Sequence, residues 1–212
     1  MIDLLDGALH GPDAPLRATA RALAKVDRAV AIVLVEGLTD QLALETVADL
    51  RGRDLGAERI VIVPMGGAHA IRRFLVRFGP PGERVRLAGL CDLQEAELFR
   101  RALVATRAGS PLTRTDMERL GFHVCVDDIE DELIRAVGVP GVEAIFDEQR
   151  DLGPFRSLQS QPAWRGRETH RQMRRFLGSG ASRKLRYVRL LVEAAEARGA
   201  LPRPLEAVLA AV

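Results

Sequence analysis

Hydrophobic residues along this chain gather in short continuous runs that alternate with segments of helical periodicity. The runs lie at residues 29–35, 59–63, 84–90 and 121–126. Helical spacing fills the segments at about 39–52, 67–78 and 93–107. A continuous apolar run suits a strand that is buried on both faces. Because strands separated by helices favour right-handed crossovers, the pattern predicts an α/β fold with a mainly parallel sheet of about four strands, flanked by helices.

Helical patterns also flank this alternating region. Further helices are predicted at about 13–26, 128–138, 142–150, 182–197 and 204–211. Residues 152–168, around the single Trp164, follow no clear period and are predicted to form a linker or loop. The chain is therefore expected to divide into an N-terminal helical segment, a catalytic core and a helical C-terminal extension, at residues 1–27, 28–135 and 136–212.

Two carboxylates follow the first predicted strand. Glu36 comes directly after the apolar run, and Asp40 lies four residues later at the start of a helical pattern. Gly37 between them is expected to let the backbone turn sharply. Both acids would then share the mouth of a strand-to-helix turn, where open α/β sheets bind ligands. Two carboxylates in one place repel each other, so this turn predicts a divalent cation with oxygen ligands.

The other predicted strands also end in glycine or acid. Gly66 and Gly67 follow the second strand, Asp92 follows the third, and Asp127 and Asp128 follow the fourth. The glycines are expected to let their turn approach the site closely. Three of the four strand ends therefore carry acid.

The sequences LVEGLTDQLAL, VPMGG and GLCD, in this order, resemble the Toprim domain of overcoming-lysogenization-defect (OLD) family nucleases. The resemblance covers roughly residues 28–135. It implies a Toprim fold, the binding of one Mg²⁺ or Mn²⁺ ion, and endonuclease action on DNA. Whether a second ion binds is left open. Glu36, Asp40 and Asp92 fall on the first three acidic positions of that family's metal site.

One position departs from the family pattern. The expected Asp-x-Asp triplet is Asp92-Leu93-Gln94 here, so a neutral amide replaces a carboxylate and weakens the expected second metal. Glu95 and Glu97 follow closely and could substitute. The family also places metal-binding acids after the fourth strand.

Two glutamates match these later acids. Glu130 and Glu132 point about 200° apart on a helix, so we expect only one, Glu130, to face the site. The alternative explanation is that acids gather here because they complement a helix N-terminus.

Lysine is rare in this chain. Only Lys25 and Lys184 occur, against 29 arginines. OLD nucleases carry a lysine late in the domain near the metal, and Lys184 resembles it, which implies that Lys184 stabilises charge on a phosphate. Arg183 and Arg186 beside it are expected to bind phosphates of the DNA backbone. An exposed helix cation remains the alternative for Lys184.

Charge is distributed unevenly along the sequence. Residues 1–151 hold 25 acidic and 19 basic side chains, whereas residues 152–212 hold 4 acidic and 12 basic ones. This asymmetry fits an acidic catalytic part that attracts cations and a basic part that contacts nucleic acid. A solvated basic face would give the same count, so charge alone leaves both interpretations open.

Several classes of protein are disfavoured. No apolar run approaches the roughly 20 residues that span a bilayer, and the N-terminus lacks a basic start, so a cytoplasmic protein is expected. Cys91 and Cys125 are isolated and are expected to be core thiols.

No P-loop or dinucleotide fingerprint occurs. OLD nucleases resemble fusions with an ABC-type ATPase, so the resemblance implies a free-standing Toprim unit or one that uses an ATPase on a separate chain.

The sequence thus predicts a Mg²⁺- or Mn²⁺-dependent DNA endonuclease. The alternative is a non-catalytic nucleic-acid-binding or regulatory Toprim protein with a degenerate metal site, as Gln94 suggests. A topoisomerase is disfavoured because the only tyrosine, Tyr187, lies on a tail helix, and a primase would need a zinc module. The oligomeric state stays open, a homodimer included.

Overall fold

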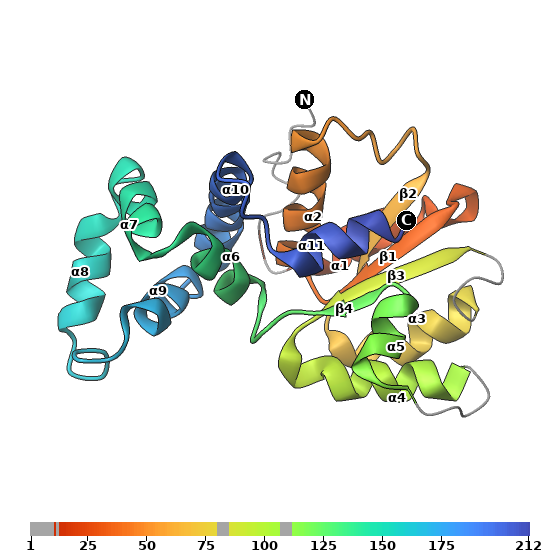
Figure 1. The fold of residues 1–212 in the computed structure, drawn as a ribbon. Coiled ribbons are helices and arrows are strands. Elements are labelled where there is room, and N and C mark those ends of the chain that lie inside the picture. Colours follow the sequence, from red (N-terminus) through yellow and green to blue (C-terminus); the bar gives the residue numbers. More distant parts are fainter. Residues whose placement is uncertain (1–10, 12, 80–84, 107–111) are drawn as a thin grey trace.

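A four-stranded parallel sheet forms the centre of the protein (Figure 1). The computed structural model describes residues 11, 13–79, 85–106 and 112–212. The strands are β1 (Ala31–Val35), β2 (Ile60–Pro64), β3 (Arg86–Cys91) and β4 (Phe122–Val124). Their order is β2-β1-β3-β4, and every neighbouring pair runs parallel. The predicted α/β fold with a parallel sheet of four strands is confirmed.

Helices cover both faces of this sheet. The helices that precede β4 are α1 (Ala14–Leu23), η2 (Val26–Arg28), α2 (Leu38–Leu50), η3 (Ala68–Ala70), α3 (Ile71–Phe78), η4 (Leu93–Glu95), α4 (Ala96–Thr106) and α5 (Arg114–Arg119). Those that follow are α6 (Ile129–Val137), α7 (Val139–Glu148), α8 (Leu152–Ser160), α9 (Thr169–Leu177), α10 (Ala181–Ala197) and α11 (Arg203–Ala210).

Alternating residues of each strand point into two separate cores. Ile32 and Leu34 of β1 pack in the core formed with α1, α3 and α4. Ala31, Val33 and Val35 pack in the core formed with α2, α10 and α11. All five side chains are at most 1% exposed, which explains why the sequence shows an unbroken apolar run. Cys91 and Cys125 are free and buried in these cores, as predicted.

Helices α6 to α10 gather to one side of the sheet (Figure 1). The prediction of a linker or loop at 152–168 was wrong for its first half, because residues 152–160 form α8. Pro154 lies in the first turn of this helix, where a missing N–H costs nothing. Phe155 is fully buried and packs edge-on against Phe146 and Phe176, and this contact fixes the helix although its sequence period is weak.

The C-terminal helices return to the sheet. Helix α10 packs along α2, and α11 packs on α2, β3 and β4. Residues on both sides of the expected boundary at 135 therefore share one hydrophobic core. The three-part division stays a prediction. No helix in the described part of the chain is both long and apolar enough to cross a membrane.

Candidate metal centre

The acids predicted at the strand ends lie together at the carboxyl edge of the sheet. Because β1, β3 and β4 run parallel, Glu36, Asp92 and residues 127–128 leave the sheet on the same side. The backbone N–H of Asp92 donates a hydrogen bond to Glu36 Oε1 at 3.0 Å, which joins two strand ends directly. The N–H of Gly67 donates to the backbone oxygen of Glu36 at 2.9 Å, so the glycine loop meets the same point.

The three predicted glycines differ in what they contribute. Gly66 and Gly67 have φ of 77° and 114°, in the left-handed region where side chains are strained. Gly37 instead has extended backbone, and a Cβ added to it would meet no atom within 4 Å. The backbone at position 37 therefore does not itself require a glycine. The Asp40 side chain holds this turn, because the Gly37 N–H donates to its Oδ2 at 2.9 Å.

Asp40 is a buried acid among other acids. Its side chain is 9% exposed, and burial raises the pKa of Asp40 to about 7. The hydrogen bond from Gly37 opposes this rise, while the charges of Glu130 and Glu36 add to it. Asp40 on α2 thus lies within electrostatic reach of acids that follow β1 and begin α6.

Asp92 also lies among several neighbouring acids. Burial, and after it the charges of Glu36, Asp40, Asp128 and Glu130, together raise the pKa of Asp92 to about 8. Asp92 begins the short helix η4, yet its carboxylate makes no capping hydrogen bond there. The side chain is therefore held in a repulsive environment without a structural hydrogen bond in its own turn.

Lys184 is the cation of this cluster. Its Nζ lies 2.9 Å from Glu130 Oε1, and Glu130 is only 4% exposed. Burial alone would lower the pKa of Lys184, but Glu130, Asp40 and Asp128 outweigh it and raise that pKa. Burial also raises the pKa of Glu130, and the ion pair opposes the rise. The lysine singled out by its rarity thus lies inside the acidic cluster, carried there by α10.

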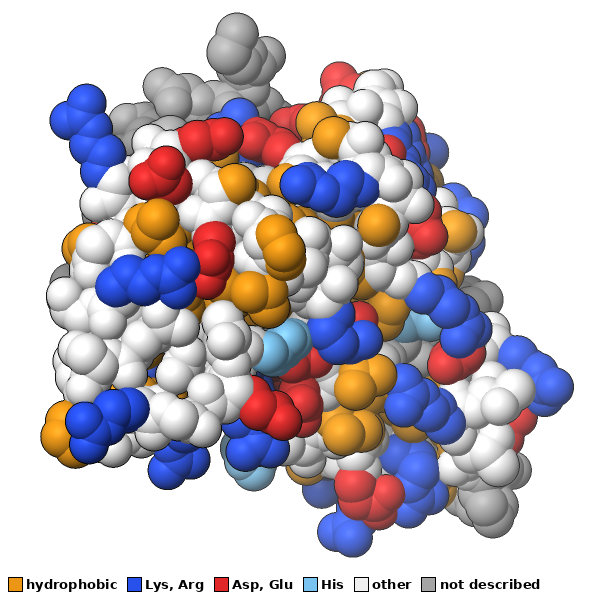
Figure 2. Space-filling model, turned by 60° about the vertical axis from the view of Figure 1, so that its left-hand side comes forward, with side chains coloured by type: hydrophobic (Ala, Val, Ile, Leu, Met, Phe, Trp, Pro, Cys, Tyr) orange, Lys and Arg blue, Asp and Glu red, His pale blue; other side chains and the backbone are white. Residues whose placement is uncertain are grey.

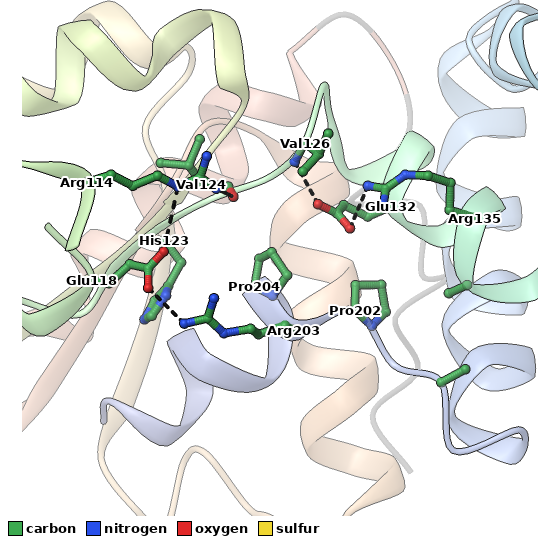
Figure 3. Close-up of a pocket in the computed structure, with 12 residues that line it drawn as sticks. Arg114, Glu118, His123, Val124, Val126, Glu132, Arg135, Pro202, Arg203 and Pro204 are labelled. Carbon is green, nitrogen blue, oxygen red and sulfur yellow. Dashed lines mark hydrogen bonds and ion pairs between the residues drawn. The ribbon is translucent and has the colours of Figure 1, made fainter.

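The remaining predicted acids have different surroundings. Gln94 is exposed, whereas Glu95 is partly buried and its charge contributes to the raised pKa of Glu36, after burial itself. Glu132 turns away from the cluster and accepts a hydrogen bond from the Val126 N–H at 2.6 Å. It also pairs with Arg135 at 2.8 Å. Figure 3 shows this side chain between Val126 and Arg135, at one end of a hollow of about 440 Å³ beside β4.

The hollow in Figure 3 is lined by charges that are already paired. Arg203 contacts Glu118 at 2.8 Å, and Arg114 donates to the backbone oxygen of Val124 at 2.8 Å. These contacts connect α5, β4 and α11. The hollow lies where these elements pack together, and its lining includes none of Glu36, Asp40, Asp92 and Glu130.

The donor chemistry at the carboxyl edge fits a hard divalent cation, since carboxylate oxygens are the ligands that Mg²⁺ and Mn²⁺ prefer. Within the described residues, no three acid, histidine or cysteine side chains converge on one ion position as they stand. Glu36 accepts a hydrogen bond from the Asp92 N–H, Asp40 accepts one from the Gly37 N–H, and Glu130 pairs with Lys184. Each carboxylate therefore has a substitute partner, and rotation of Glu36 and Glu130 would be needed to complete an ion site.

Arg183 and Arg186, predicted to bind nucleic acid, form ion pairs within the chain, although Arg186 remains exposed. Both pair with Asp151, and Tyr187 donates a hydrogen bond to the same carboxylate at 2.8 Å. The Arg183 guanidinium also lies 4.4 Å from the ring centre of Phe176. These contacts fix α10 against the start of α8. The burial of Tyr187, with no exposed surface, also argues against a nucleophilic role.

A groove of about 940 Å³ opens beside Lys184 and Glu130 and extends along α9. Besides Lys184, its basic lining includes residues that the sequence reasoning missed, among them Arg167, Arg171, Arg174 and Arg175. Figure 2 shows this side of the molecule, where acidic side chains gather beside a histidine with arginine and lysine side chains around them. The available signal was the density of arginines around Trp164, in a segment that was predicted to be a linker.

The sheet order and the acids at its carboxyl edge define a parallel α/β protein with a candidate cation site at the strand ends. Residues 29–79 match the family model described as "Overcoming lysogenization defect protein-like, TOPRIM domain". This match covers the first two strands and the glycine loop, so this part of the chain is similar to OLD-like Toprim domains.

Solved structures share the fold of this chain. The C-terminal region of the Burkholderia pseudomallei OLD protein superposes with a TM-score of 0.59 at 17% identity, covering 86% of this chain and 96% of that chain. The C-terminal region of the Xanthomonas campestris pv. campestris OLD protein gives 0.58 at 17% identity, covering 86% and 93%. At this identity the likeness establishes the fold. No curated protein matches the chain.

Proposed function

We propose that this protein is a Mg²⁺- or Mn²⁺-dependent endonuclease that hydrolyses DNA phosphodiesters. The observation that carries the proposal is the meeting of Glu36, Asp40, Asp92 and Glu130 around Lys184, with the pKa values of Asp40 and Asp92 raised to about 7 and about 8. Such repulsion is relieved when a divalent cation binds. The OLD-like Toprim match supports the nuclease class.

In this proposal Glu36, Asp40 and Asp92 hold the principal ion, and Glu95 with Glu130 assists a second. Bound there, the ion would lower the pKa of an attacking water and stabilise negative charge on phosphate oxygens. Glu132 is left out of this set because its carboxylate holds the Val126 N–H and Arg135.

The chain's own side chains contribute the positioning. Lys184 is kept charged by its acidic neighbours and lies beside the acids, so it can neutralise a phosphate oxygen that approaches the ion. Rotation of Glu130 toward an ion would free the Lys184 ammonium for that contact. Without metal, Glu130 and Lys184 would neutralise each other. When metal and substrate bind, Glu130 would turn to the ion and Lys184 to the phosphate.

Plasmid nicking tests the proposal. Supercoiled plasmid is incubated with the protein and Mg²⁺ or Mn²⁺, beside Glu36→Gln and a control, Glu148→Gln, whose site on α7 is exposed. We expect nicked product from the wild type and the control and a fall of about 100-fold in Glu36→Gln, because an amide is a poor ligand. Nicking by the wild type no faster than by Glu36→Gln would refute the nuclease.

A second candidate is a nucleic-acid-binding Toprim protein without catalysis. The observation behind it is the exposed Gln94 in place of a carboxylate. It predicts salt-dependent plasmid binding with no cleavage in either metal. Under both candidates DNA is the partner, and an ABC-type ATPase on a separate chain remains a proposed partner, which co-purification with such a chain would test.

A further inference from the structure

The groove beside Lys184 has an acidic and a basic wall. On the α6 side three of the acids that line the groove have basic partners. The Nε atoms of Arg174 and Arg135 donate to Asp128 and Asp131 at 2.7 and 2.8 Å, and Lys184 lies 2.9 Å from Glu130. The acidic wall is therefore largely neutralised by internal contacts.

The basic wall keeps its charge available. Arg171 is exposed and makes only a 4.0 Å contact with the exposed Glu168, which is a weak ion pair. Arg175 is exposed and forms no ion pair within the described part of the chain. Both residues line the groove from α9, four positions apart and so on one face of the helix.

Trp164 lines the same groove on a fixed loop. Its backbone oxygen accepts a hydrogen bond from Gln172 Nε2 at 2.8 Å, and Gln172, only 4% exposed, accepts in turn from Gln159 at 2.6 Å. The Arg167 guanidinium lies 5.5 Å from the Trp164 ring centre. A partly exposed indole beside Arg167, on a loop whose backbone is held by the buried Gln172, is preorganised to contact a flat, anionic ligand.

We infer that this groove holds a single strand of nucleic acid, with a base stacked on Trp164 and the backbone phosphates on Arg171 and Arg175; the inference rests on the proposed nuclease function. Stacking on an aromatic ring beside cationic side chains is how single strands are bound without sequence preference. A duplex keeps its bases stacked inside, so it would leave Trp164 unused. The volume of about 940 Å³ suits a few nucleotides at most.

The only tryptophan of the chain is Trp164, so its fluorescence reports this groove alone. The measurement uses full-length Asp92→Asn protein in EDTA, titrated with a 12-nucleotide oligothymidylate, a blunt hairpin duplex and a polyglutamate peptide. We expect saturable quenching by the oligothymidylate and little by the other two. Equal quenching by the duplex, quenching by the peptide alone, or no quenching would each overturn the single-strand inference.

Variants locate the contacts through the anisotropy of a labelled oligothymidylate. Trp164→Ala should weaken binding about 10-fold, with partial recovery in Trp164→Phe, because a phenyl ring still stacks. Arg171→Ala and Arg175→Ala should each reduce the slope of log affinity against log salt by about 0.7. Arg165→Ala, an exposed arginine of the same loop outside the groove lining, should change neither quantity. Unchanged binding in Trp164→Ala would refute the stacking contact.

The inference and the proposed function fail in different ways. Quenching without plasmid nicking would leave a single-strand binding groove on a protein that is not a nuclease. Nicking without quenching would leave the nuclease and refute the groove.

Discussion

The substitution Asp92→Asn should stabilise the metal-free protein. Asp92 lies where burial and the charges of Glu36, Asp40, Asp128 and Glu130 all oppose its ionisation. Its carboxylate makes no capping hydrogen bond, so an amide of the same shape loses no contact in its own turn. A residue retained at a cost in stability is expected where function requires charge.

The magnitude follows from the pKa. Burial and the neighbouring acids raise the pKa of Asp92 from 3.8 to about 8, and at 1.36 kcal/mol per unit this sets an upper limit of about 5 kcal/mol at pH 8. Water reaches Asp92, and the same repulsion is shared among several acids, so we expect a gain of about 1–2 kcal/mol. For a chain of 212 residues this corresponds to a rise in Tm of about 2–8 °C.

Thermal unfolding of wild type, Asp92→Asn and Asp147→Asn, followed by circular dichroism in EDTA at pH 8, measures the effect. Asp147 is an exposed acid of α7 and should leave Tm unchanged. Addition of Mg²⁺ or Mn²⁺ should raise the Tm of the wild type and of the control but not that of Asp92→Asn. A lower Tm for Asp92→Asn than for the wild type in EDTA would show that the acids do not repel each other, and the argument for a cation would fail.

Three further outcomes are expected. The metal-free wild type should lose stability as pH rises from about 4 to 8, because these carboxylates ionise near pH 4 in the unfolded chain. In the folded protein Asp40 keeps its proton to about pH 7 and Asp92 to about pH 8. A series of Tm values in EDTA that does not change with pH would contradict this. Lys184→Met should cost about 1–2 kcal/mol at pH 8 and less as the pH is lowered, because the raised pKa of Glu130 favours its protonated form there; the double variant Lys184→Met/Glu130→Gln should recover the loss. Urea unfolding in a pH series measures it, and a loss that does not change with pH would argue against the ion pair. Gly89→Ala should cost about 1–3 kcal/mol in the same assay because its Cβ would lie 2.6 Å from the Phe122 ring, and an unchanged midpoint would mean that β3 and β4 are less tightly packed than described.

The strand pattern was readable from sequence because the sheet is covered on both faces. A strand buried on two sides needs an unbroken apolar run, and such runs stand out between helices of ordinary period. Helix α8 escaped prediction for the opposite reason. Its period is weak, and one buried residue, Phe155, supplies the contact with Phe146 and Phe176 that makes it a helix.

The acids of the candidate site were predictable to the extent that strand ends are predictable. Parallel strands bring their carboxyl ends to one edge, so Glu36 and Asp92 were expected at the same edge once the strands were assigned. The strand order, which places β1 beside β3 and makes them neighbours, came from the structure. Side-chain direction was harder. Glu130 and Glu132 lie on one helical turn, and only the packed structure shows that one meets Lys184 while the other binds the Val126 N–H.

By itself the sequence determined the parallel sheet and the acids at its edge, because burial and strand alternation are local properties that leave a direct pattern in the chain. Only the tertiary structure decided which basic side chains form ion pairs within the protein and which line the groove. Arg183 and Arg186 form ion pairs with Asp151, while Arg171 and Arg175 line the groove. That choice depends on how α9 and α10 pack against distant helices, and no periodicity in their own residues encodes it.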